Sequence, residues 1–447
     1  MRRSADPARE RIWRSAWILT LDGEPLRDGA VALRGGRVSQ VGPAESIIRD
    51  HPGLPVEDRG DDIIVPGLVD AHCHLEWSLL DGLLPSAGFA EWLGRMLPLR
   101  MLMLPGDYAT AARLGALRAL EAGTTALADS GPTGAGAAAI AESGQRALIH
   151  LEAFGRDTGD AAAEAAERVA AGVAALDAVV GPRGRAGVSP HAPYSVGPAL
   201  WAALRAHPVL TDRPWATHLA ESSDEERVIA TGEGPLGELF AAAGLEPGRW
   251  EGPHGAGPVA RVAGAGVTAP GLIAAHCVRL GADDPATLAA AGVGVAHCPR
   301  SNAHLRCGRA PLEALREAGV AVGLGSDSPA SGGDYDLRAE ARACRATHAG
   351  WLDLDAEATL RLITIDAARV IGLDAEVGRL APGTRADLVA LRPERPDDDP
   401  WEAALDARTA VRAVVVDGEV LLRDGAPTRV DAAEVRTRAA EARGRLC

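Results

Sequence analysis

The chain has 447 residues, which is enough for two or three average domains or for one large barrel with an accessory domain. Its formal net charge of −15 and its lack of any Lys/Arg block argue against a general attraction to nucleic acid or to anionic membrane surfaces. No apolar run approaches the length of a membrane span, and the start MRRSADPARERIW lacks the apolar stretch of a secretory signal. We therefore expect a cytoplasmic protein with a small-molecule partner.

Strand-like segments with tight turns occupy both ends of the chain. AWILTLDG, GAVALRGGRVSQVG and DDIIVPG lie near the N-terminus, and ADLVALRP and VRAVVVDGEVLLRDG lie near the C-terminus, with Asp-Gly or Gly-Gly at the turns. We predict that residues 1–62 and 377–447 together form a small β-sandwich. The tail AAEVRTRAAEARGRL is rich in Ala, Arg and Glu, which favours a terminal helix.

The middle of the chain, residues 63–376, alternates short apolar runs with Ala/Leu-rich segments of helical length, such as YATAARLGALRALEAG and DAAAEAAERVAAGVAALDAVV. This alternation is typical of an α/β protein with a parallel sheet. Eight such units predict a TIM (β/α)8-type barrel, whose chemistry lies where the strands end. The candidate strands end in LVDAHCH, TTALADS, ALIHLEAFG, AGVSPHAPY, WATHLAES, LIAAHCV, VGVAHCPRSN and VAVGLGSDS.

Histidines and a carboxylate follow several of these strands. His72 and His74 are two residues apart at the end of the first strand, so both can face the barrel axis while Cys73 points into the wall. His218, His276 and Asp327 follow the fifth, sixth and eighth strands. Imidazole and carboxylate donors converging on one mouth favour zinc or ferrous iron, because calcium and magnesium prefer oxygen ligands alone.

These motifs resemble the amidohydrolase superfamily, in its cytosine-deaminase/chlorohydrolase branch. In that branch PG[LF]xxxHxH opens the barrel, and HxxE, HC and SDS follow; the resemblance covers nearly the whole chain. It implies a hydrolytic enzyme that holds one divalent metal, most often Zn²⁺ with Fe²⁺ as the alternative. The implied metal ligands are His72, His74, His218 and Asp327. Glu221 would be the proton shuttle, and His276 would lie near the attacking water.

Two features of composition bear on the metal site. All 46 basic residues are arginine, and binuclear members of the superfamily bridge two metals with a carboxylated lysine. We therefore expect a mononuclear site. The six cysteines never form a Cys-x-x-Cys pair, which favours free thiols over a disulfide framework or a structural zinc knuckle.

The family chemistry then gives each polar residue a role. A divalent metal lowers the pKa of water to about 7, Asp327 accepts its proton, and Glu221 delivers a proton to a ring nitrogen as ammonia leaves. Glu225 and Glu226, in ESSDEE, are expected on a solvated helix surface.

Substrate contacts are expected from a histidine and two arginines. His191, in SPHAPYS, resembles a histidine of S-adenosylhomocysteine deaminase-like enzymes that contacts the purine. Arg100 stands where adenosine-type members carry Glu, and Arg300 where many relatives have a small residue. Because guanidinium forks match carboxylates, and because HLE, EAFG, HLAES and CPRSN resemble 6-aminodeoxyfutalosine deaminases of menaquinone biosynthesis, we expect an adenosine-like substrate with a carboxylate.

Several further residues carry alternatives. Arg156 and Arg306 are additional candidates for the carboxylate, Asn302 and Ser301 either line the rim or cap the next helix, and Trp77, Trp92 and Trp215 either stack on the substrate or pack. The remaining histidines are expected to be structural or on the surface, with His297 the one most easily mistaken for a ligand; they are His51, His150, His207, His254, His297, His304 and His348.

Three functions remain open from the sequence. The first is deamination of an adenine nucleoside derivative, either 6-aminodeoxyfutalosine or S-adenosylhomocysteine/methylthioadenosine. The second keeps the metal but changes the substrate, as in guanine deaminase or a triazine-type chlorohydrolase. The third is a catalytically dead scaffold, since TIM barrels host unrelated functions. A homodimer is compatible with any of them.

Overall fold

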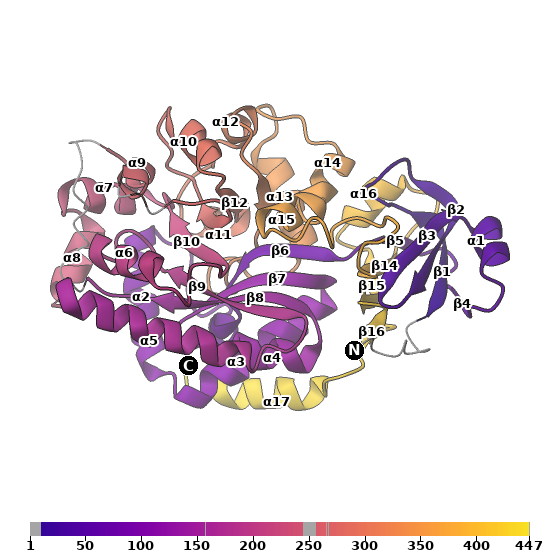
Figure 1. Ribbon diagram of the computed structural model, residues 1–447, viewed down its shortest axis with the longest axis horizontal. Coiled ribbons are helices and arrows are strands. Elements are labelled where there is room, and N and C mark those ends of the chain that lie inside the picture. The colour runs from indigo at the N-terminus through magenta and orange to yellow at the C-terminus, as the bar shows by residue number, and fades with distance from the viewer. Residues whose placement is uncertain (1–9, 157, 245–255, 265, 267, 447) are drawn as a thin grey trace.

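The computed structural model describes residues 10–156, 158–244, 256–264, 266 and 268–446. Within these ranges, none of the helices combines the length and the apolar character needed to cross a membrane. The described residues form a barrel and, beside it, a second sheet (Figure 1).

Eight parallel strands, adjacent in chain order, form the barrel sheet. Every predicted barrel strand is present, and the helices between them cover the outside, as the sequence pattern indicates. The strands are β6 (Leu68–Cys73), β7 (Thr124–Gly131), β8 (Arg146–Ala153), β9 (Gly184–Pro190), β10 (Trp215–Leu219), β11 (Leu272–His276), β12 (Gly294–His297) and β13 (Val322–Leu324).

The helices of the barrel region follow the strands. The two predicted from Ala/Leu-rich segments are α3 (Pro105–Glu121) and α5 (Gly159–Asp177). A 3-10 helix spans Leu75–Leu80. The others are α2 (Phe89–Leu102), α4 (Gly136–Ser143), α6 (Pro198–Ala206), α7 (Ser223–Thr231), α8 (Pro235–Ala242), α9 (Pro258–Gly264), α10 (Asp284–Ala290), α11 (Pro299–His304), α12 (Leu312–Glu317), α13 (Leu337–Thr347), α14 (Ala356–Arg361) and α15 (Ile365–Val370).

The barrel closes where its last strand meets its first. Cys73 and Asp327 form an isolated parallel bridge. The Asp327 N–H donates to the His72 carbonyl over 3.0 Å, and the His74 N–H donates to the Asp327 carbonyl over 2.9 Å. Three predicted metal ligands therefore lie on the backbone hydrogen bonds that close the barrel.

Strands from both termini form the second sheet, in the order β17-β16-β15-β14-β5-β1-β2-β3 with β4 paired to β1. Strands from both ends of the chain thus share one sheet, in line with the predicted fold class. The strands are β1 (Arg11–Ile18), β2 (Leu26–Arg34), β3 (Arg37–Pro43), β4 (Val56–Asp58), β5 (Ile63–Pro66), β14 (Leu388–Arg392), β15 (Ala410–Val416), β16 (Glu419–Arg423) and β17 (Ala426–Pro427). Helix α1 (Ala44–Asp50) follows β3 in the N-terminal segment, and helix α16 (Pro400–Leu405) lies between β14 and β15 in the C-terminal segment.

The boundary between the two parts differs from the predicted one at residue 62. Strand β5 pairs in parallel with β1 and antiparallel with β14, so Ile63–Pro66 belongs to the terminal sheet and the barrel begins after Gly67. The reason is that β5 supplies the joint between N-terminal and C-terminal strands, whose side chains share one core cluster containing Trp13, Ile64 and Val415.

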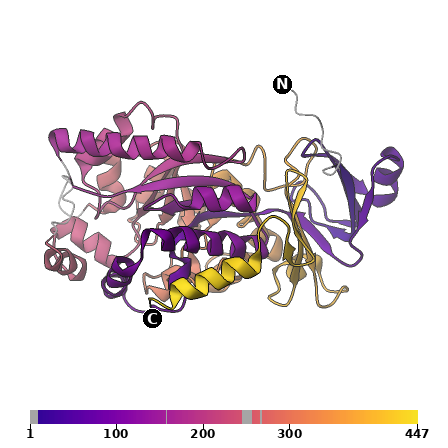
Figure 2. The same cartoon turned by 90° about the horizontal axis from the view of Figure 1, so that it is seen from below.

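The terminal helix α17 (Ala432–Arg443) is helical as predicted, but it packs on the barrel rather than on the terminal sheet. Figure 2 shows it lying along α3. Arg436 pairs with Glu121 at 2.5 Å, and Arg445 pairs with Asp107, so both contacts join the tail to α3. These ion pairs with α3, together with the burial of Val435, hold α17 against the barrel.

Gly325 offers a test of the closed barrel. A Cβ at this position would lie 2.6 Å from the His72 carbonyl oxygen and 2.9 Å from the His72 nitrogen, both backbone atoms. We expect Gly325→Ala to destabilise the protein by about 1–3 kcal/mol, because neither strand can move without opening the seam. Thermal unfolding measures the loss. Gly23→Ala is the control, since its Cβ would meet nothing within 4 Å; an unchanged Tm for both variants would contradict the tight seam.

Candidate metal centre and active site

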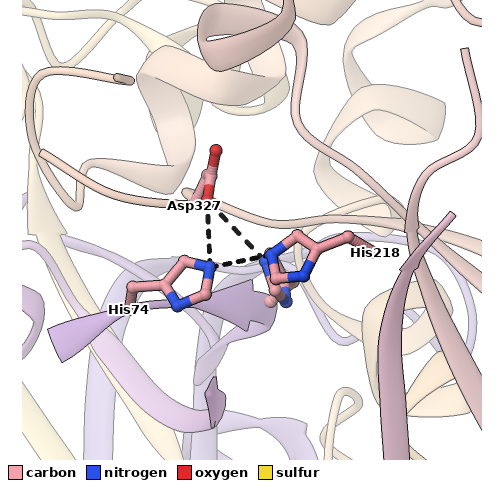
Figure 3. Close-up of side chains that lie close together, drawn as sticks. His74, His218 and Asp327 are labelled. Carbon is pink, nitrogen blue, oxygen red and sulfur yellow. Dashed lines mark hydrogen bonds and ion pairs between the residues drawn. The ribbon is translucent and has the colours of Figure 1, made fainter. Parts of the chain in front are cut away.

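Three imidazoles and one carboxylate meet at the C-terminal mouth of the barrel. His72 lies in β6 and His74 follows that strand directly, His218 lies in β10, and Asp327 follows β13. All four are buried, and each offers a ligand atom within 4.8 Å of the others. Figure 3 shows His74, His218 and Asp327 pointing toward one another. The predicted ligand set is thus brought together in space.

Carbonyl groups in or just after neighbouring strands orient two of the imidazoles. His74 Nδ1 donates to the Ser130 carbonyl over 2.7 Å, and His218 Nδ1 donates to the His191 carbonyl over 2.8 Å. Each ring therefore turns an Nε2 lone pair inward, and the two Nε2 atoms lie 3.0 Å apart. Burial lowers the pKa of both rings, that of His218 to about 4, so a proton does not bridge them at neutral pH.

The other two members of the group, His72 and Asp327, also turn a possible ligand atom toward its centre. His72 Nε2 is buried without a hydrogen-bond partner among the described residues, and lies 3.7 Å from Asp327 Oδ1. Oδ2 of Asp327 accepts hydrogen bonds from Ser301 and Ser331, which leaves Oδ1 facing the imidazoles. Converging lone pairs and a carboxylate oxygen are the donors that zinc or ferrous iron binds, so the residues present fit a divalent metal.

The contact with Asp327 corrects the role expected for Ser301. Helix α11 has Cys298 at its N-cap, and Ser301 lies inside the helix with its hydroxyl on the metal-group carboxylate. Asn302 also does not cap: it is 1% exposed, and its Oδ1 accepts from His276 Nδ1 over 3.0 Å. Helix α11 thus places Ser301 against the Asp327 carboxylate and Asn302 against the His276 ring.

Backbone strain gathers at the mouth. Ala220, His276, Cys277 and Asp327 all have positive φ, between 48° and 73°. Such conformations are costly for residues other than glycine, and they persist where surrounding contacts fix them. Here they turn the chain sharply at the ends of β10, β11 and β13, which aims the side chains of the site inward.

Glu221 and His276 lie together on one side of the metal group. Glu221 Oε1 is 3.7 Å from His276 Nε2, and both side chains are buried. Burial, reinforced by the Asp327 charge, raises the pKa of Glu221 well above its usual range. Burial lowers the pKa of His276 to about 4. At neutral pH Glu221 can therefore carry a proton while His276 stays neutral, which suits proton delivery by the carboxyl group.

Glu225 was expected on a solvated surface, and this expectation is wrong. Glu225 is fully buried, and its carboxylate accepts from the Ala220 and Glu221 N–H groups over 3.2 and 2.6 Å. Its own N–H donates to Ser222 Oγ over 3.1 Å. Ser222 therefore caps α7, while the Glu225 carboxylate binds the two N–H groups that precede Ser222; the Ser-x-x-Glu spacing in the sequence was the signal for this helix start. Glu225 thus holds the turn that presents Glu221. Glu226 lies on the surface as expected and pairs with Arg279.

A cavity of about 550 Å³ opens above the metal group. His191 lines it, with its ring centroid 4.8 Å from that of His218 and 4.6 Å from that of Phe154. Trp77 and Trp92 also line it, whereas Trp215 begins β10 at the opposite end of the barrel and packs under Arg205. The walls are mostly aromatic and aliphatic, which suits a flat heteroaromatic substrate.

Two of the four candidate arginines reach this cavity. The Arg100 guanidinium lies 5.7 Å from the Trp77 ring and 5.3 Å from the Phe154 ring, and Arg156 lies 4.7 Å from the Phe240 ring. Arg300, expected to bind substrate, is not among the cavity-lining residues. Its guanidinium turns to Asp334 at 2.6 Å and to buried Glu340 at 3.5 Å, which neutralise it.

The other expectations are settled by position. Arg306 lies outside the cavity lining and donates to the Ser86 carbonyl. His297 is buried beside His348, away from the metal group, with ring centroids 5.5 Å apart. His254 lies outside the described residues.

Comparison with known proteins shows the family. The amidohydrolase family matches residues 63–421, and the chain belongs to this family. It is therefore a hydrolytic enzyme, and the His/His/His/Asp group is its candidate metal site.

Particular relatives span almost the whole chain. It is 31% identical over 447 residues to a 5-methylthioadenosine/S-adenosylhomocysteine deaminase of Symbiobacterium thermophilum, covering 96% of each chain. It is similar to the structure of an adenosine deaminase from Xanthomonas campestris with bound zinc, at 25% identity and TM-score 0.81, covering 98% of each chain. The Helicobacter pylori aminofutalosine deaminase, at 20% identity and TM-score 0.78, covers 92% of this chain and all of its own, and shares the fold.

Removing one imidazole tests the metal centre. We expect excess zinc to raise the stability of the wild type by about 2.7 kcal/mol at a concentration of 100 times Kd. His74→Ala should lose this gain and its bound metal, because one of the two facing Nε2 donors is gone. Thermal unfolding with and without zinc, and metal analysis after dialysis, measure both. His51→Ala, in which the lost ring contacts Gln40, is the control; equal metal content in His74→Ala and wild type would contradict the site.

Proposed function

We propose that this enzyme is a hydrolytic deaminase of an adenine nucleoside derivative, with 6-aminodeoxyfutalosine as the preferred substrate and ammonia as a product. The observation that carries the proposal is one cavity with a metal group and a buried acid at its deep end and an arginine among aromatic rings further out. An adenine ring, a sugar and a distal carboxylate match these parts in that order.

The proposal includes one divalent metal, with Zn²⁺ favoured by the three imidazoles and Fe²⁺ as the alternative. His72, His74, His218 and Asp327 would hold it. When bound, it supplies a Lewis acid that makes water a nucleophile near neutral pH. A single ion is expected because the chain has no lysine to carry a bridging carbamate.

Two residues transfer protons and a third orients the attacking oxygen. Asp327 Oδ1 faces the imidazoles and is the acceptor for the proton of the attacking water. His276 is held by Asn302 with Nε2 turned toward Glu221, so it orients the attacking oxygen. Glu221, buried and raised in pKa, delivers a proton to the adenine ring nitrogen next to the carbon under attack. The proton held by Asp327 then passes to the amino group, which leaves as ammonia, and Glu221 regains a proton from the new hydroxyl on the ring carbon, which becomes the carbonyl of the product.

Recognition of the base and of the carboxylate falls to different residues. His191 Nδ1 contacts Ser195 Oγ at 2.7 Å, which fixes the ring beside the metal group for contact with the purine. Arg100 lines the cavity beside two aromatic rings, where its guanidinium is placed to meet a carboxylate. Arg156 lines the same cavity and is the second candidate for the carboxylate.

The comparisons support the reaction more strongly than the substrate. Relatives at 31% identity are named 5-methylthioadenosine/S-adenosylhomocysteine deaminases, and the aminofutalosine deaminase shares the fold. S-adenosylhomocysteine also carries a carboxylate. A direct comparison of these nucleosides decides between them.

Glu221→Gln tests the reaction. The wild type should convert adenine to hypoxanthine in a panel of adenosine, methylthioadenosine, S-adenosylhomocysteine and aminodeoxyfutalosine, followed by absorbance and ammonia release. Glu221→Gln should lower kcat by about 100- to 10,000-fold, because the amide cannot deliver the proton. Its metal content should stay that of the wild type, since Glu221 is outside the ligand set. Chloride release from a triazine, with no ammonia from any nucleoside, would move the enzyme to the chlorohydrolases.

Arg100→Met tests the carboxylate contact. We expect kcat/KM for aminodeoxyfutalosine to fall about 10- to 100-fold, mainly through KM, because a charged hydrogen bond is worth about 1.5–3 kcal/mol. Methylthioadenosine, which has no carboxylate, should be affected much less. Arg306→Met is the matched control, because this arginine lies outside the cavity. An equal loss on both substrates would show that Arg100 supports the cavity rather than the carboxylate.

A further inference from the structure

The cavity contains one buried carboxylate that neither the metal group nor the proposed proton transfers use. Glu152 is the penultimate residue of β8, lines the cavity, and has a side chain that is 2% exposed. Its Oε1 has no hydrogen-bond partner among the described residues. The closest ring nitrogen is His74 Nδ1 at 3.9 Å, and its proton already goes to the Ser130 carbonyl. A buried carboxylate oxygen without a donor is costly, so a ligand that brings donors is favoured here.

Glu152 lies between the metal group and the outer arginine. A carboxylate oxygen of Glu152 is within 4.8 Å of ring nitrogens of His191 and His218. Beyond the end of β8, Phe154 is 39% exposed, and the Arg100 guanidinium is 5.3 Å from its ring. The order from the deep end outward is therefore metal group, Glu152, Phe154 and Arg100.

We propose that Glu152 selects the sugar of the substrate by accepting hydrogen bonds from the vicinal hydroxyls of a ribose. The inference rests on the proposed function, because an adenine ring at the metal group places the attached sugar at the depth of Glu152. A carboxylate offers two acceptor oxygens, and the ribose 2′ and 3′ hydroxyls are adjacent donors. The adenine amino group is another donor of such a molecule, and it lies at the reacting carbon.

This assignment makes the enzyme a ribonucleoside deaminase. A site built to bind a substrate hydroxyl rejects the analogue that lacks it, because its own buried polar group is left unpaired. We expect the wild type to prefer a ribonucleoside over its 2′,3′-dideoxy counterpart by about 10- to 1,000-fold in kcat/KM, since two hydrogen bonds to one buried group are lost.

The experiment uses the full-length, metal-loaded enzyme. The probes are the ribonucleoside that the wild type deaminates fastest in the panel above and the 2′,3′-dideoxy form of the same compound. Glu152→Met keeps the length of the side chain and removes both acceptors. It should lower kcat/KM on the ribonucleoside about 10- to 100-fold through KM, and change the dideoxy compound less than about threefold. Glu152→Gln, which keeps one acceptor, should recover part of the loss.

Two controls separate sugar recognition from damage to the site. Metal content is measured for every variant, because Glu152 lies 3.9 Å from His74. Glu91→Met makes the same change at an exposed acid on α2 that pairs with Arg95, and should leave both substrates unaffected.

Specific results would overturn the proposal. Equal losses on both substrates in Glu152→Met, or loss of metal, would place the carboxylate in the chemistry or the metal site. If Glu152→Met does not fold, the wild type still decides, because equal kcat/KM on the two sugars contradicts a hydroxyl-binding carboxylate. A wild type that deaminates no adenine nucleoside would remove the proposed function and this inference with it. An active wild type without sugar preference removes the role of Glu152 alone.

Discussion

Two imidazole lone pairs that face each other at 3.0 Å are the constraint on which this structure depends. The tautomers of His74 and His218 are set by the carbonyls of Ser130 and His191, which belong to or follow the neighbouring strands β7 and β9. The register of the parallel sheet therefore determines which nitrogens point inward. Because burial keeps the rings neutral, a cation is the natural partner for the lone pairs. The strand register that defines the barrel therefore also orients these two candidate metal ligands.

Closure of the barrel supplies the fourth donor. Asp327 follows β13 in a positive-φ conformation, and its backbone exchanges hydrogen bonds with both residues of the His72/His74 pair. Ser301 and Ser331 fix the Asp327 side chain by donating hydrogen bonds to one of its carboxylate oxygens. Strained backbone at this seam is tolerated because hydrogen bonds on both sides fix it, in line with the usual clustering of strain at functional sites.

The cavity separates reaction from recognition along its depth. Glu221 and His276, which are proposed to deliver a proton and to orient the attacking oxygen, lie buried beside the metal group. The Glu225 carboxylate accepts a hydrogen bond from the Glu221 N–H group and so fixes the turn that carries Glu221. Arg100 lies further out among aromatic rings. Burial strengthens the polar contacts of Glu221, Glu225 and His276, because the local dielectric is low.

The sequence alone determined the features that depend on local spacing. The alternation of strands and helices predicted the barrel, and His72-x-His74 predicted a shared face because side chains alternate along a strand. The terminal sheet was also visible from its turns. The tertiary structure decided what depends on contacts between distant segments: that β5 joins the terminal sheet, that α17 packs on α3, and that Arg100 reaches the cavity while Asp334 and Glu340 hold Arg300 away. The spacing of these residues does not predict their partners. Each partner lies far away in the sequence, or is one of many acidic residues that the sequence does not distinguish.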